Sequence, residues 1–295
     1  MIRIIPRLDI KGLNVVKGLC FDGYRVLGTA DRLAELYYKE GADELFIQDV
    51  VASLYERNNL LDFVSLAAEK VRIPITVAGG IRSVDNIGEV LRAGADKVAI
   101  NTAAIKEPSL IERAAKKFGS QCIVLSIEAK RRTANKYEAW TDYGRQPTGV
   151  DVFEWALQVE NLGAGEIYLS SVDRDGSGEG YDLELINEVS LKASIPVIAS
   201  SGAGSLEDVS KAVLQGNAEA VSAASVFHYH YFDKFLDELE GSEEGELRMG
   251  RQEDLGNIEF IKEGYGGFNA IQVDPFSIRS AKEELKKRGV AVRLK

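Results

Sequence analysis

Two acidic residues occupy corresponding points of two apolar segments and are the first candidates for chemistry. Asp9 ends the segment 4–9 (IIPRLD), and Glu128 ends the segment 124–128 (VLSIE). Two carboxyl groups that flank one substrate can divide general acid and general base work between them. The alternative for each is a structural role, as a loop cap or as the ion-pair partner of a lysine such as Lys17. Residue type and spacing leave both interpretations open.

Small residues form two sets of turns that are suited to binding phosphate. The first set is Gly79, Gly80, Asn101 and Thr102, and the second is Asp175, Gly176, Gly202, Ala203, Gly204, Ala224 and Ser225. Glycine lets backbone N–H groups approach an anion closely, and a hydroxyl at a helix start adds a donor. The glycines can equally serve tight turns, but that explanation does not predict matching hydroxyls. We therefore expect a substrate phosphorylated at both ends, with Lys17 and Ser170 as further substrate-binding candidates.

The chain repeats itself at an offset of about 120 residues, which is far longer than a solenoid repeat. The segment 73–81 (IPITVAGGI) is similar to 195–204 (IPVIASSGAG), and the segment 41–44 (GADE) is similar to 163–166 (GAGE). A repeat of this length indicates two halves of one closed domain. We expect half-domains at about 1–120 and 121–230, each with one phosphate loop.

Short apolar strands alternate with helical segments along most of the chain. The expected strands are 3–8, 44–48, 75–77, 97–100, 122–127, 166–170, 197–199 and 220–222. The expected helices are 30–40, 60–70, 83–93, 108–118, 150–162, 183–192 and 205–215. This pattern predicts an α/β protein, a single (β/α)8 TIM barrel over residues 1–295, built from two homologous half-barrels. Such barrels place chemistry after the C-terminal ends of the strands, where both carboxylates and the phosphate turns fall.

Four charged residues begin four of the expected strands, at the opposite end of the barrel. They are Arg3, Glu44, Lys97 and Glu166. Two positive and two negative side chains would therefore converge on the barrel floor. A closed ring of ion pairs can act as a gate or as a plug that only seals the floor, and position alone does not separate the two.

Composition limits the remaining classes of function. A formal net charge of −10 argues against broad binding to nucleic acid or an anionic membrane. The N-terminus does not resemble a signal peptide and no apolar run approaches the length of a membrane span, so we expect a cytoplasmic protein. Cys20, Cys122, His228 and His230 show no metal-ligand spacing, and we expect neither a metal nor a cofactor.

Motifs along nearly the whole chain resemble the cyclase subunit of imidazole glycerol phosphate synthase. They lie at 4–9, 94–98, 101–104, 118–121, 171–176, 225–228 and 292–294. In that family a glutaminase partner releases ammonia below the barrel, and the ammonia crosses it to a doubly phosphorylated ribulosyl intermediate. The resemblance implies that Asp9 is the principal acid/base and Glu128 its partner. It also implies that the four floor residues form the ammonia gate, and that the glutaminase docks on the N-terminal face, with Asp96 taking part.

Several residues depart from the pattern of that family. The second carboxylate is Glu128 where the family has aspartate, and Ala78 and Ser201 replace glycines in the phosphate turns. Arg7 stands where the family has a small residue or cysteine. Its cation can lower the pKa of Asp9, bind an anionic substrate group or form an ion pair with Glu128. The residues expected at the mouth of the barrel therefore differ from those of the family.

An acidic, turn-rich insertion at about 232–277 precedes the expected C-terminal helix and tail at 278–295. It is interpreted as a surface excursion, with an active-site cover or a docking surface as alternatives. Together these departures favour a paralogous branch that serves amidation of a surface-polysaccharide sugar, with a separate sugar amidotransferase as a candidate third partner. The alternatives are a genuine histidine-pathway cyclase, a non-catalytic scaffold that conducts ammonia, and a sugar-phosphate isomerase.

Overall fold

A computed structural model describes residues 1–12, 14–19, 22–50, 58–231 and 273–294. Most of the expected insertion at 232–277 lies outside these residues, so its boundaries and role stay predictions. The side chain of Lys17 is likewise not among those described. Within the described part, no helix has the length and apolar character that a membrane crossing requires.

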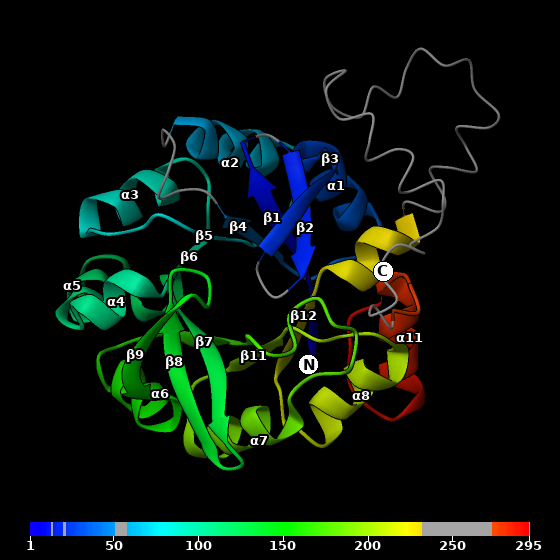
Figure 1. Cartoon of the computed structure of the whole chain (residues 1–295). Coiled ribbons are helices and arrows are strands. Elements are labelled where there is room, and N and C mark those ends of the chain that lie inside the picture. Colours follow the sequence, from blue (N-terminus) through cyan, green and yellow to red (C-terminus); the bar gives the residue numbers. More distant parts are fainter. Residues whose placement is uncertain (13, 20–21, 51–57, 232–272, 295) are drawn as a thin grey trace.

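Eight parallel strands close into a barrel, as the alternating pattern predicts (Figure 1). In order around the barrel they are β1 (Arg3–Lys11), β4 (Leu45–Asp49), β5 (Ile75–Ala78), β6 (Lys97–Ile100), β7 (Ile123–Thr133), β10 (Glu166–Ser171), β11 (Val197–Ser200) and β12 (Ala220–Ala223). The barrel closes where β1 pairs with β12, with Ile4 opposite Val221. The fold is thus a single (β/α)8 TIM barrel.

Helices surround the strands on the outside of the barrel (Figure 1). They include α1 (Ala30–Lys39), α2 (Asn58–Lys70), α3 (Val84–Arg92), α4 (Thr102–Lys106), α5 (Ser109–Phe118), the 3-10 turn η1 (Ser120–Cys122), α6 (Val152–Asn161), α7 (Leu183–Lys192), α8 (Leu206–Leu214) and α11 (Ile278–Lys287), and residues 225–231 are also helical. The expected caps are present, since Ser83 accepts a hydrogen bond from the Asn86 N–H and Ser205 forms a capping box with Asp208.

Two antiparallel hairpins that the sequence analysis did not predict follow the first and fifth barrel strands. The first contains β2 (Asn14–Leu19) and β3 (Asp22–Thr29), and the second contains β8 (Lys136–Thr141) and β9 (Gln146–Asp151). Because β7 continues to Thr133 and β9 ends at Asp151, the fifth strand is longer than expected, and α6 begins at 152 instead of 150. The hairpins occupy equivalent places in the two halves, which agrees with the internal repeat.

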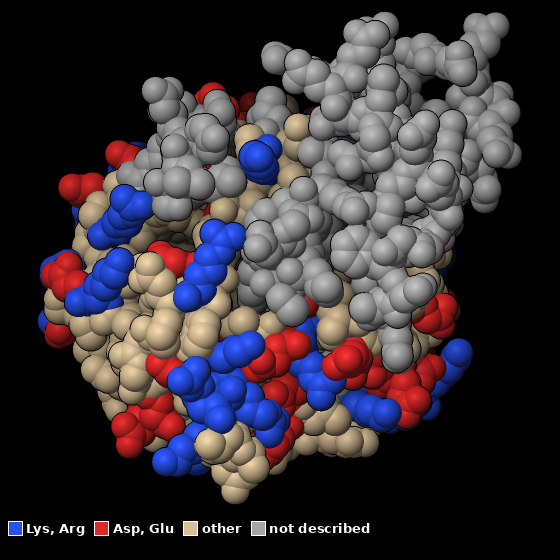
Figure 2. Space-filling model, viewed as in Figure 1, with Lys and Arg blue, Asp and Glu red and all other residues tan. Residues whose placement is uncertain are grey.

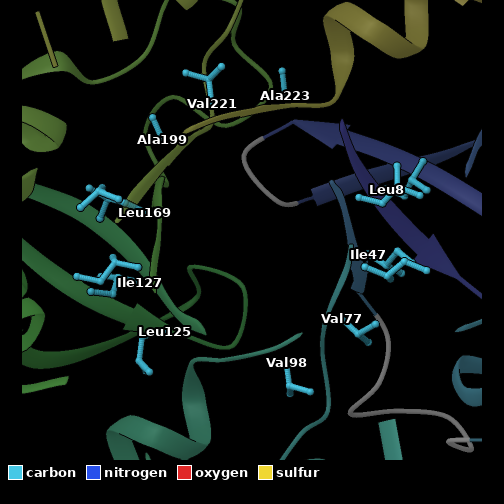
Figure 3. Close-up of a cluster of buried hydrophobic side chains, with 14 of the residues drawn as sticks. Leu8, Ile47, Val77, Val98, Leu125, Ile127, Leu169, Ala199, Val221 and Ala223 are labelled. Carbon is cyan, nitrogen blue, oxygen red and sulfur yellow. The ribbon is translucent and has the colours of Figure 1, made fainter. Parts of the chain in front are cut away.

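Successive side chains of each strand point alternately to the inside and the outside of the barrel, and this produces two apolar cores. Residues such as Leu8, Ile47, Val98 and Leu169 form part of the outer core, and Figure 3 shows these side chains arranged around the barrel. The inner core takes one residue from each of the eight strands: Ile5, Phe46, Ala78, Ala99, Val124, Tyr168, Ile198 and Ala220. By the same alternation, Arg3, Arg7 and Asp9 face the barrel interior with Ile5.

The C-terminal helix is fastened to the N-terminal end of the barrel. Lys282 of α11 is buried, and its ammonium group donates to the Asp43 carboxylate at 2.7 Å and to the Gly41 carbonyl at 2.7 Å. Ile2 forms a parallel bridge with Val292 close by. These contacts hold the last described segment against the loop that precedes β4.

Candidate active site and barrel floor

Asp9 lies at the C-terminal end of the barrel interior and is bound by an arginine. The residue is only 3% exposed, and Arg7 Nε donates to Asp9 Oδ1 at 2.7 Å. Burial alone would lower the pKa of Arg7, but attraction to Asp9, Tyr168 and Asp175 outweighs burial and raises this pKa well above its usual value. Arg7 is therefore a permanent cation. The ion pair that the structure shows joins Arg7 to Asp9, whereas the ion pair considered from the sequence was one with Glu128.

Glu128 lies on the opposite side of the barrel from Asp9, because three strands separate β1 from β7 in either direction. It is buried, and its carboxylate accepts a hydrogen bond from the Gly144 N–H at 2.8 Å. Burial raises the pKa of Glu128 to about 7, against the opposing effects of Gly144, Arg7 and Asn101. A carboxyl group that titrates near neutrality can both donate and accept a proton, as general acid–base catalysis requires.

The second set of phosphate candidates surrounds a cavity beside Asp9. The cavity has a volume of about 350 Å³, which includes the part that is open to solvent. It is lined by Arg7, Asp9, Asp175, Gly176, Ser200, Ser201, Gly202, Ala203, Ser222, Ala223, Ala224 and Ser225. All the candidates of this set except Gly204 thus lie together, and the Gly204 N–H instead donates to Asp208 at the start of α8. Ser170 is buried on β10 but does not line the cavity.

The turn that forms one wall of this cavity requires glycine at position 202. Gly202 has φ of 101°, and a Cβ atom there would lie 2.3 Å from the Gly180 carbonyl oxygen. Ser201, which replaces a glycine of the family pattern, also has a positive φ of 76°. Its hydroxyl donates to Asp175 Oδ1 at 3.2 Å, so the side chain joins the wall of the cavity.

The first set of phosphate candidates is approached by the β8–β9 hairpin. Gly79 has φ of 106°, and a Cβ atom there would lie 2.4 Å from the Asp49 carbonyl oxygen. Asn101 Nδ2 donates to the Trp140 carbonyl at 3.1 Å, and Thr102 Oγ1 accepts from the Asp142 N–H at 3.2 Å. Two of the polar candidates are therefore already bonded to the hairpin.

The tip of the same hairpin reaches the end of β4. Tyr143 has a positive φ of 61°, its hydroxyl donates to the Asp49 carbonyl, and it accepts from Gln48 Nε2 at 3.2 Å. Sequence reasoning missed Tyr143 and Trp140 because it assigned no hairpin here. The alternation of polar and apolar residues at 136–139 (KYEA) is the signal that could have revealed it, and it matches the burial of Tyr137 and Ala139 in β8.

The four floor residues form a closed ring of ion pairs. Arg3 Nη1 lies 2.8 Å from Glu44 and 2.9 Å from Glu166, while Lys97 Nζ lies 3.0 Å from Glu44 and 2.9 Å from Glu166. Each cation thus bridges the same two carboxylates, which is the arrangement expected from the sequence. Asp96, the docking candidate, is exposed, and it accepts a hydrogen bond from the Ile75 N–H at 2.9 Å.

The described residues provide neither a cluster of metal ligands nor a uniform surface charge on the face shown in Figure 2. Among the described residues, no three His, Cys, Asp or Glu side chains gather where they could hold a metal ion. Figure 2 shows basic and acidic side chains interspersed over the coloured part of one face of the molecule.

Comparison with known proteins gives a consistent result. The family model described as "Histidine biosynthesis protein" matches residues 3–233. The chain is 58% identical over 207 residues to imidazole glycerol phosphate synthase subunit HisF of Legionella pneumophila, covering 70% of this chain and 98% of that relative. It is 51% identical over 227 residues to the subunit of the same name from Dehalococcoides mccartyi (strain ATCC BAA-2100 / JCM 16839 / KCTC 5957 / BAV1), covering 77% and 89%. The barrel with its paired interior carboxylates therefore belongs to the histidine biosynthesis protein family.

Proposed function

We propose that this protein is the cyclase subunit of an imidazole glycerol phosphate synthase. In this role it receives ammonia from a glutaminase and uses it to convert the phosphoribulosyl aminoimidazole carboxamide intermediate. The products are imidazole glycerol phosphate and aminoimidazole carboxamide ribotide. The observation that carries the proposal is the placement of Asp9 and of Glu128, whose pKa is about 7, on opposite sides of one barrel interior.

Each part of the site has a task in this reaction. Addition of ammonia and release of the carboxamide product require protons to be moved on both sides of the ribulosyl chain, and two facing carboxyl groups can perform this work. Turns rich in backbone N–H groups suit the terminal phosphates. Arg7 adds a fixed positive charge to the cavity beside the second turn, where it can offset the charge of a phosphate.

The proposed route of ammonia begins at the ion-pair ring on the floor. A glutaminase docked around this ring, on the face to which Asp96 belongs, would release ammonia below Arg3 and Lys97. The ring is closed in the structure, so passage requires at least one ion pair to open. Each cation is bound by the same two carboxylates, so separating one cation from them is a local movement, which supports a gate.

The polysaccharide branch favoured by the sequence departures receives no support from the comparisons. Both relatives described above bear the name of the histidine-pathway enzyme. One observation favours a second candidate function. Arg7 binds an oxygen of Asp9, the proposed principal acid/base, and that oxygen is then not available for proton transfer. In this second candidate the protein delivers ammonia to a different acceptor, with or without a third subunit.

The two candidates are separated by a turnover assay with the purified protein. The ribulosyl intermediate is supplied with excess ammonium at alkaline pH, and loss of its absorbance is followed. The proposal predicts turnover that is abolished in Asp9→Asn and retained in Asp85→Asn, a matched change at an exposed position of α3. Absence of turnover from the folded wild-type protein would refute the cyclase proposal and favour a different acceptor.

A further inference from the structure

Two aromatic rings meet inside the barrel, between its floor and the candidate active site. Phe46 on β4 and Tyr168 on β10 are 0% and 1% exposed. Their ring centroids are 3.8 Å apart and their planes differ by 15°, so the rings are stacked face to face. Three strands separate β4 from β10 in either direction around the barrel. Rings that meet from opposite strands must lie across the barrel axis.

The stack lies directly above the ion-pair ring. Phe46 is two residues beyond Glu44 on β4, and Tyr168 is two residues beyond Glu166 on β10, so each ring occupies the next inward-facing position. The other members of the inner core are three alanines, Ala78, Ala99 and Ala220, with Ile5, Val124 and Ile198. The two aromatic rings are thus the largest side chains of the inner core.

The hydroxyl of Tyr168 connects the stack to the candidate active site. Ser200 Oγ donates to the Tyr168 oxygen at 2.8 Å, and the hydroxyls of Tyr168 and Ser222 share a hydrogen bond of 2.9 Å. Ser200 and Ser222 also line the cavity that contains Asp9 and Arg7. A ligand in this cavity therefore competes for the same hydroxyls that hold the Tyr168 ring in place.

We propose that Phe46 and Tyr168 form an inner gate on the ammonia path, which opens when an anionic ligand in the cavity engages Ser200 and Ser222. The proposal rests on the ammonia route of the proposed function. Rings in face-to-face contact leave no passage along the axis, so ammonia that has crossed the floor must wait until one ring moves. Coupling this movement to ligand binding delivers ammonia when its acceptor is present.

The first experiment measures product formed per glutamine hydrolysed in the complex with a glutaminase. Phe46→Trp enlarges one ring at a filled position, and we expect product per glutamine to fall about tenfold or more. Turnover with ammonium, which reaches the site from the open mouth, should be unchanged in the same variant. Phe63→Trp is the matched control, because Phe63 is a buried phenylalanine of the outer core, on α2, and should leave both quantities unchanged. An unchanged ratio in folded Phe46→Trp would overturn the proposal.

The second experiment does not depend on turnover. Tyrosine rings of the wild-type protein are labelled with carbon-13, and the Tyr168 signals are assigned by their loss in Tyr168→Phe. Titration with inorganic phosphate should shift or broaden the Tyr168 signals and leave those of Tyr137, in the β8–β9 hairpin, unchanged. If phosphate binds and the Tyr168 signals do not respond, the link between cavity and gate is refuted. Failure of the proposed function is recognised separately, by absence of turnover with ammonium.

Discussion

The buried carboxyl of Glu128 gives a quantitative prediction that combines stability with pH. Replacing Glu128 with glutamine preserves an oxygen that can accept the hydrogen bond from the Gly144 N–H. It removes the ionisable group whose pKa burial raises to about 7. The variant therefore tests the charge of the side chain with little change in its shape.

The magnitude follows from the shift in pKa between the unfolded and folded states. A rise from 4.5 to about 7 corresponds to about 3 kcal/mol, at about 1.4 kcal/mol for each unit. The pKa of Glu128 is higher in the folded protein than in the unfolded chain. Below pH 4.5 the carboxyl is protonated in both states, so its ionisation does not affect stability. As the pH rises from 4.5 to about 7, the unfolded chain ionises while the buried carboxyl does not, and the folded state is progressively destabilised. Glu128→Gln should therefore raise the free energy of unfolding by about 3 kcal/mol at pH 8, but by less than about 1 kcal/mol at pH 5.

Urea denaturation at the two pH values, followed by circular dichroism and tryptophan fluorescence together, measures this difference. Glu154→Gln is the control, since Glu154 is exposed on α6 and its replacement should have the same small effect at both pH values. Equal stabilisation of Glu128→Gln at pH 5 and pH 8, or destabilisation at pH 8, would refute the reasoning. The variant should also lose cyclase turnover, because glutamine cannot transfer a proton.

The barrel floor and the second phosphate turn give two further predictions. Lys97→Met leaves Glu44 and Glu166 with a single cation, so we expect a loss of about 3 kcal/mol in stability and a lower yield of product per glutamine. Turnover with ammonium should persist, and an unchanged yield per glutamine would show that the ring is only a plug. Gly202→Ala should lose about 3 kcal/mol or more in thermal or urea unfolding, because its Cβ would meet a carbonyl oxygen at 2.3 Å. Gly289→Ala has a similar positive φ with open space around it, and should lose only about 1 kcal/mol.

Much of the barrel could be predicted because its strands and helices are encoded locally. The strand Lys97–Ile100 and the helix Leu183–Lys192 have the bounds expected from their apolar patterns and flanking residues. The floor ring could be predicted because its four members lie at the start of a strand or, for Glu44, just before it, and parallel strands bring their starting points to one end of a barrel. The second hairpin was missed because β9 (QPTGVD) lacks the run of β-branched and aromatic residues that marks a strand, and its pairing depends on β8.

The sequence by itself determined the fold and the family, and it predicted a twofold repeat and the end of the barrel at which we expect the chemistry, since each depends on patterns within short segments or on their recurrence. Only the tertiary structure decided which groups face one another. It pairs Arg7 with Asp9, gives Glu128 a pKa near 7 through burial, and stacks Phe46 on Tyr168. These properties depend on distances and burial between strands that lie far apart in the chain, and closure of the barrel is what sets those distances.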